Sequence, residues 1–447
     1  YRNINEKNIS KNNQYNFDVK YTYPITDSLK IAVGSAYNLT DSETNNRTWN
    51  YNDVTGEYDN LNNDLTRFYS TKLNEFNPYA QLLLNKNKIS ATVRFGANIY
   101  NQQNFGTFKA DDYSSTQNKT LPDISGNIRY QSGNNSLSLM YNYQTSLAST
   151  SQVLPILDET DPLDVFKGNP DLDPNKAHQI NLMFSNFDRK TRQGFNANLG
   201  YTYNESNIVN YTEMDYSIYK RTTTYENVKG NYRLNGNFFF NKQYQKGINK
   251  FRVNVGMSAS YALTQGFRDA VKYEQYNTTL SPTLRLNWDY GDYLTISPSY
   301  RLNFTNSKYV NYSIDNQNNI THNFGIKTIS TFPKNLTWTN DFSYNYNSRM
   351  AAGFKRDFFL WNTSLMYRFF DDKLEAGVKV YDLLNQNNSY TRTITAESTI
   401  DQRNNILTRF VMFSLTFNLN QFGGKSTKNG DGNRPREGGG MRRMEMQ

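Results

Sequence analysis

The chain has 447 residues, a formal net charge of +9, no cysteine, 35 tyrosines and 28 phenylalanines. The lack of cysteine excludes a disulfide scaffold and a cysteine-ligated zinc site. No run of about 20 apolar residues occurs, which excludes a transmembrane helix. A membrane protein built from strands is not excluded, because a transmembrane strand turns only every second residue to lipid. The basic residues are scattered and no recognition helix is visible, so we predict no nucleic-acid partner.

Alternating strands dominate the chain from its first residues. The repeated unit is about ten residues with an apolar side chain at every second position, followed by a turn. We count about seventeen such strands. Short turns between paired strands are indicated at 25–28, 85–88, 132–135, 188–193, 241–250, 289–293, 332–335 and 371–373.

Long connections alternate with these short turns. They are expected at 39–74, 101–120, 145–175, 204–225, 264–276, 306–321, 347–357 and 383–405. Short periplasmic turns, long outer loops and aromatic residues near the ends of apolar faces are typical of outer-membrane barrels. We therefore predict an all-β fold, a transmembrane antiparallel up-and-down β-barrel over residues 1–422. The Gly-rich basic segment 423–447 is predicted to be a flexible periplasmic tail.

The number of strands also carries an expectation. The first and last predicted strands both run toward the short-turn side, whereas a closed bacterial barrel has an even number of strands. We therefore expect at least one further strand before Tyr1, and a barrel wide enough to need a channel or a plug.

The last predicted strand has one apolar face and one mostly polar face. In a barrel the apolar face meets lipid and the polar face, which includes Thr416, lines the lumen. The predicted lipid-facing residues of this strand are Val411, Phe413, Leu415, Phe417 and Leu419.

A proline-rich stretch, DPLDVFKGNPDLDPNKAH, runs from Asp161 to His178. Proline fixes φ and removes a backbone donor, so the part around Pro170 and Pro174 cannot pair as a central strand. We predict a rigid connector with a structural role, and keep direct ligand contact as the alternative. The candidate loop residues are Asp161, Pro162, Gly168, Asn169, Pro170, Leu172 and Pro174.

Together with the segment DLLN at 382–385 and the alternating last strand, this stretch resembles the barrel of TonB-dependent receptor-like proteins. The most similar group is the outer membrane β-barrel family abundant in Bacteroidota. In that family a GNPxLxPE-like segment leads from an outer loop into a strand, and its usual glutamate is Asn175 here. The resemblance implies the C-terminal portion of a plugged barrel of about 22 strands.

Function and partners are also implied by this resemblance. The implied activity is energy-coupled uptake of a solute across the outer membrane of a Gram-negative bacterium. The implied partners are outer-membrane lipid and lipopolysaccharide, an inner-membrane energy-transducing protein and a surface lipoprotein. Two alternatives stay open, because fold does not fix function: a structural barrel subunit of a larger secretion or assembly complex, and a soluble all-β adhesin.

Basic residues recur on the predicted lumen face, where charge avoids the high free-energy cost of facing lipid. They would favour anionic solutes, or else pair with acidic residues of a plug or of the wall itself. The candidates are Arg94, Arg129, Arg233, Arg285, Arg301, Lys327, Arg368 and Lys379.

Catalytic and metal-binding patterns find little support. The two histidines, His178 and His322, lie far apart in the sequence and outside any metalloprotease or triad-like context. Acidic residues cluster between Asp158 and Asp173, and carboxylates are calcium ligands, but their spacing matches no EF-hand. We predict that the protein is not an enzyme, and that it carries no cofactor and no metal.

Overall fold

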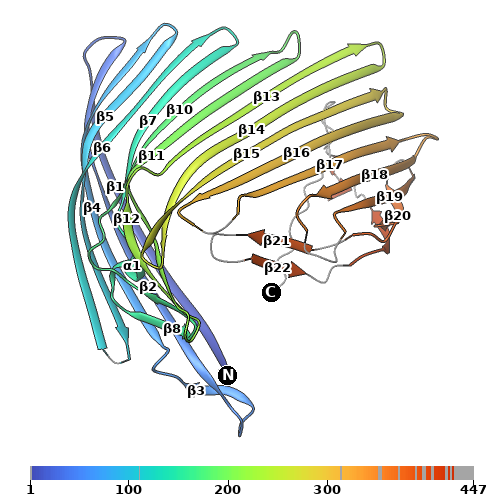
Figure 1. Ribbon diagram of the computed structural model, residues 1–447. Coiled ribbons are helices and arrows are strands. Elements are labelled where there is room, and N and C mark those ends of the chain that lie inside the picture. The colour runs from blue at the N-terminus through green and yellow to red at the C-terminus, as the bar shows by residue number, and fades with distance from the viewer. Residues whose placement is uncertain are drawn as a thin grey trace.

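The computed structural model describes residues 3–109, 111–312, 315–350, 355–370, 373–387, 390–394, 399–403, 407–417, 421–422 and 425–426. Most of them belong to one sheet of 21 strands. The sheet is strongly curved and leaves a gap between its first and last strands (Figure 1). In the described part of the chain, no helix is long and apolar enough to cross a membrane.

Seventeen strands of the sheet run as a continuous series of neighbours and are called the long strands, although the last two have only 8 residues each. The other four, of 4 to 9 residues, lie beside this series and are called the short strands. The long strands are β1 (Ile4–Pro24), β2 (Leu29–Asn52), β4 (Arg67–Lys86), β5 (Ile89–Phe108), β6 (Asp111–Ser132), β7 (Asn135–Ser146), β10 (Asn175–Asp188), β11 (Gln193–Asp215), β13 (Tyr232–Lys246), β14 (Asn249–Arg268), β15 (Val271–Tyr290), β16 (Leu294–Val310), β17 (Gln317–Ser330), β18 (Leu336–Asn347), β19 (Asp357–Phe369), β20 (Leu374–Tyr381) and β23 (Phe410–Phe417).

The remaining elements are small. The short strands of the main sheet are β3 (Glu57–Leu61), β8 (Leu157–Asp161), β9 (Asp164–Lys167) and β12 (Lys220–Val228). A helical turn, α1 (Thr150–Val153), precedes β8. Two separate hairpins are formed by β21 (Tyr390–Ile394) with β22 (Thr399–Arg403), and by β24 (Gln421–Phe422) with β25 (Lys425–Ser426).

Each long strand pairs antiparallel with the next long strand in the sequence. This arrangement confirms the predicted up-and-down topology. Within the described residues β1 pairs only with β2 and β23 only with β20, so these two strands form the edges of the sheet. The predicted tail, apart from residues 425–426, lies outside the described residues.

The long connections are shorter than the sequence predicts. β2 continues to Asn52, and β5 and β6 pair up to Phe108 and Asp111, so much of the expected loops 39–74 and 101–120 is strand. The apolar alternation stops there, but backbone pairing does not need it, since hydrogen bonds join the strands whatever their side chains. These strands are therefore much longer than the roughly ten residues that cross a bilayer.

Alternation gives the sheet two different faces. On the outer face large apolar side chains are exposed, including Val19 at 73%, Phe95 at 60% and Phe413 at 78% exposed. Exposure of this kind fits a surface that meets lipid.

Aromatic rings form two belts on the outer face. Nearer the long-loop end lie Tyr143, His178 and Tyr203, and further around the sheet Tyr261 stacks on Tyr276. Nearer the short turns Phe251 stacks on Trp288, with ring centroids 6.2 Å apart. On β14 the ten steps from Phe251 to Tyr261 span roughly 34 Å, or about 24 Å at a tilt of about 45°, close to the apolar band of outer-membrane barrels.

The last strand offers a direct test of the face assignment. Leu415 is 72% exposed on the outer face, whereas Thr416 pairs with Glu375 on the inner face. Leu415→Arg is expected to lower the free energy of unfolding in lipid vesicles by about 2 kcal/mol, because it places a charge in lipid. The matched change Thr416→Arg should leave it nearly unchanged. Equal effects of the two changes, measured by urea titration, would contradict the assignment. The fifth predicted lipid-facing residue, Leu419, lies outside the described residues.

Candidate functional site

The inner wall of the curved sheet is polar. Residues that face each other across two paired strands share a face, and this rule places the eight candidate basic residues on the inner face. Their partners in register are Gln81 for Arg94, Ser138 for Arg129, Thr202 for Arg233, Asn254 for Arg285, Thr283 for Arg301, Asp341 for Lys327, Glu375 for Arg368 and Met412 for Lys379.

Some inner-wall cations are neutralised by carboxylates of the wall itself. Arg94 Nε lies 2.8 Å from Asp123 Oδ2, and its guanidinium stacks 3.7 Å from the ring centroid of Tyr79. Arg252 Nη2 lies 2.8 Å from Asp289 Oδ2. In these two pairs a carboxylate of the wall offsets the positive charge.

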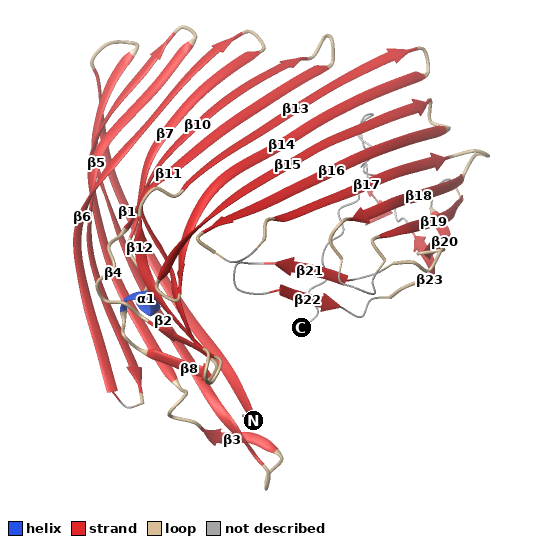
Figure 2. Cartoon of the chain, viewed as in Figure 1, coloured by secondary structure: helices blue, strands red, loops and turns tan. Residues whose placement is uncertain are grey.

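The connection between β7 and β10 folds inward. We call residues 148–174 the inward-folded segment; it contains α1, β8 and β9. Figure 2 shows α1 and β8 within the curve of the sheet, where α1 contacts β4 and β9 pairs with β12. Gln102 Nε2 of β5 donates to the carbonyl of Ala148 at 3.1 Å, and Thr150 donates to Asn104 Oδ1 at 2.9 Å.

Two small apolar clusters hold the segment in place. Leu154 and Ile156 are buried against Phe108 of β5, with Tyr69 and Tyr113 packed around them. The second cluster joins Ala148, Val153 and Leu172, with Ile208 and Tyr225 alongside. Burial of each large side chain stabilises by about 1.5–3 kcal/mol, so the two clusters hold the segment against the inner face of the sheet.

Leu154 sits between two glycines. A Cβ at Gly106 of β5 would lie 2.7 Å from Ile156 Cδ1 and 2.9 Å from Leu154 Cδ1. A Cβ at Gly168 would collide with the backbone carbonyl of Leu154. Gly168 is therefore required because two backbone segments approach closely.

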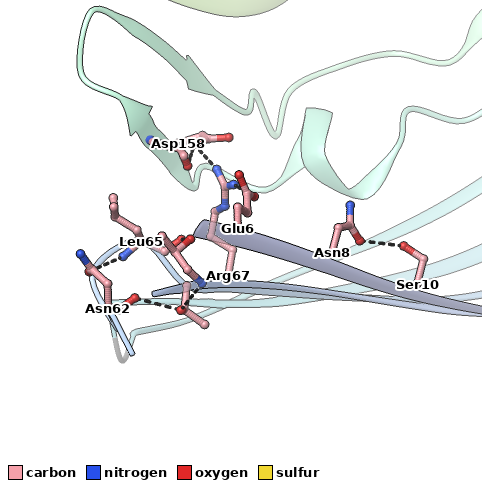
Figure 3. A network of polar contacts seen from close by, with 10 residues as sticks. Glu6, Asn8, Ser10, Asn62, Leu65, Arg67 and Asp158 are labelled. Atoms are coloured by element: carbon pink, nitrogen blue, oxygen red, sulfur yellow. Dashed lines mark hydrogen bonds and ion pairs between the residues drawn. The ribbon is translucent and has the colours of Figure 1, made fainter. Parts of the chain in front are cut away.

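Arg67 of β4 ties the segment to the sheet (Figure 3). Its side chain is only 5% exposed; its Nη2 lies 3.1 Å from Glu6 Oε1 of β1, and its Nη1 forms an ion pair with Asp158 of β8. Burial disfavours the charge on Asp158, but hydrogen bonds from Arg67 and Thr160 outweigh it and hold the pKa of this carboxyl below its usual range. The contact is thus complete above the ordinary carboxyl pKa and is lost as the pH falls through the lowered value.

A second ion pair accompanies a strand pairing. β9 runs parallel to β12, with Asp164 opposite Arg221 and Val165 opposite Thr222. Arg221 Nε donates to Asp164 Oδ1 at 2.9 Å, and Val165 is fully buried. The acidic residues of the sequence cluster are therefore used in part as anchors of the inward-folded segment.

The proline-rich motif closes the segment. Asn169 donates its backbone N–H to the carbonyl of Gln152 at 2.6 Å and its Nδ2 to the carbonyl of Tyr225 at 2.9 Å. Leu172 is only 4% exposed. Asp161 ends β8 and accepts the N–H of Leu163, and Pro162 lies in the exposed turn between β8 and β9. Pro170 is exposed and Pro174 is buried, directly before β10.

The two histidines lie in the outer aromatic belt rather than in a catalytic cluster. His178 Nδ1 is 3.0 Å from the Tyr141 hydroxyl, and His322 Nδ1 is 2.8 Å from the Tyr300 hydroxyl. Sequence reasoning missed Arg67, because its partners lie on β1 and β8, far from it in the chain, and no local pattern marks it.

The two faces, the two aromatic belts and the antiparallel topology define an outer-membrane β-barrel protein. A family model described as "outer membrane protein beta-barrel family" matches residues 1–417, and the chain belongs to this family. Membership places the protein in the outer membrane of a Gram-negative bacterium.

Solved structures give weaker likenesses. The chain is 9% identical to the copper transporter OprC, covering 91% of this chain and 72% of that one with a TM-score of 0.42. It is 10% identical to the ferripyoverdine receptor of Pseudomonas aeruginosa, covering 93% and 71% with a TM-score of 0.32. It is 9% identical to the ferric-catecholate import receptor Fiu of E. coli K12, covering 93% of this chain and 81% of that one with a TM-score of 0.25. A comparison with curated proteins found no match.

Proposed function

We propose that the protein is a TonB-dependent receptor-like barrel that takes up a solute through its lumen by an energy-coupled process. One observation carries the proposal: an apolar outer face encloses a hollowed, polar inner wall. A hollow lined by Arg252, Asp289, Lys327, Asp341 and Glu375 lies on that wall near the short turns. A solute crossing the membrane here would meet side chains able to replace its hydration.

The inward-folded segment has a natural place in this proposal. It packs on the inner wall at the long-loop end, where a ligand arriving from outside enters. It would narrow the entrance and, through its exposed Pro170 and Lys167, contribute to selection of the ligand. We propose an inner-membrane energy-transducing protein and a surface lipoprotein as partners, with outer-membrane lipid and lipopolysaccharide around the outer face. The protein itself carries out no chemical reaction.

Uptake can be tested without knowing the solute. A deletion strain and the complemented strain are grown in the same rich medium, and depletion of solutes from the medium is followed by mass spectrometry. We expect at least one solute to be depleted only by the complemented strain, and its depletion to stop when a protonophore removes the energy supply. Depletion that persists with the protonophore would indicate a passive pore. Identical depletion by both strains, with loss of secreted proteins in the deletion strain, would support a structural barrel subunit instead.

A further inference from the structure

Two neighbouring arginines of the inner wall form no ion pair with a carboxylate of the described residues. Arg285 of β15 faces Ser299 of β16, and Arg301 of β16 faces Thr283 of β15. The two arginines are thus diagonal neighbours on one face, with Cα atoms about 7–8 Å apart. Both side chains are exposed on the inner face.

Basic residues on the flanking strands each have a carboxylate close by. On β14, Arg252 is paired with Asp289. On β17, Lys327 faces Asp341 of β18 in register. Arg285 and Arg301 lie between these two positions. Their partners in register carry only hydroxyl and amide groups, so no facing carboxylate offsets their positive charge.

The arginines border a hollow that suits a ligand. Its lining includes the ring of Phe239, and Asn254, Ser299 and Asn323 supply amide and hydroxyl groups beside the guanidinium groups. Phe239 is 47% exposed on the inner face and lies opposite Gly256, which leaves space over the wall. An exposed aromatic ring beside two guanidinium groups offers an apolar surface next to a positive one.

We propose that Arg285 and Arg301 form an oxyanion-binding site for the transported solute, which carries a carboxylate or phosphate group. Each guanidinium presents a planar fork of donors that matches two oxygens of such a group. The remainder of the solute, where it is flat and apolar, lies on Phe239. This inference rests on the proposed function, since it takes the inner wall to be the path of the solute.

The test uses the intact protein, purified in a nonionic detergent at low ionic strength, and isothermal titration calorimetry. The probes are citrate, benzene-1,3,5-tricarboxylate and pyrophosphate. We expect saturable binding of one probe molecule, with a preference that distinguishes a carboxylate site from a phosphate site. Arg285→Gln with Arg301→Gln should weaken binding at least tenfold. Phe239→Ala should weaken the flat tricarboxylate more than citrate.

The matched control is Arg47→Gln with Arg356→Gln, which removes the same charge from two exposed arginines away from the hollow. This control should bind as the unchanged protein does. No binding by the unchanged protein, or equal loss in both double variants, would overturn the site. Titration involves no energy coupling, so the two experiments test different claims. Absence of binding would contradict the oxyanion site but not uptake, and absence of uptake would contradict the proposed function but not binding.

Discussion

Gly168→Ala is expected to loosen or expel the inward-folded segment. The added methyl group would collide with the carbonyl group of Leu154, whose carbon atom would lie 2.7 Å from the new Cβ. Backbone cannot yield as a flexible side chain can, and overpacking of this kind costs about 3 kcal/mol. We expect faster tryptic cleavage after Lys167, and the rate should be followed by mass spectrometry of protein folded in lipid vesicles.

A second glycine provides the control for this change. A Cβ at Gly126 of β6 would meet only the carbonyl oxygen of Thr92, at 3.8 Å, which is ordinary van der Waals contact. Gly126→Ala should leave cleavage after Lys167 unchanged. If Gly168→Ala behaves like Gly126→Ala, the close approach of the two backbone segments is wrong.

Arg67→Met is expected to release the same segment by a different route. The change keeps much of the side chain's apolar volume but leaves Glu6 and Asp158 without their shared cation. Removing one partner of a buried ion pair costs about 3–5 kcal/mol. We expect a value at the low end of this range, because both carboxylates keep part of their surface in water. Urea titration should show this loss, and cleavage after Lys167 should accelerate.

An exposed arginine on the neighbouring strand separates this effect from a general loss of charge. Arg47 of β2 is exposed, so Arg47→Met should change the free energy of unfolding by less than about 0.5 kcal/mol. Equal effects of Arg67→Met and Arg47→Met would show that the Arg67 contacts contribute nothing to the fold.

The strands and their faces could be predicted because apolar and polar side chains alternate with a period of two residues. Phe413 and Leu415 on one side and Ser414 and Thr416 on the other specify a face without reference to the rest of the chain. Beyond the membrane both faces are polar, so the same rule fails there. β2 and β5 therefore extend through regions in which the sequence predicts loops.

The inward-folded segment could be predicted only in part. The prolines of the motif exclude a central strand, and the structure, which describes every residue from Gly168 to Pro174, has no strand there. The segment folds inward because Arg67 forms an ion pair with Asp158 and because Gly106, which has no side chain, leaves room for Leu154. The residues of each pair are far apart in the chain. Such contacts leave no periodic signal.

The length of the first strands determines which part of the protein is exposed outside the membrane. From Tyr37, in the region of the outer aromatic belt, β2 continues to Asn52, a stretch of roughly 50 Å at about 3.3 Å per residue. The rim of the wall at β2 and β3 therefore rises well above the lipid head groups, and Val54 at its tip is 94% exposed. Antibodies and bacteriophages approaching the cell would therefore be able to contact this rim.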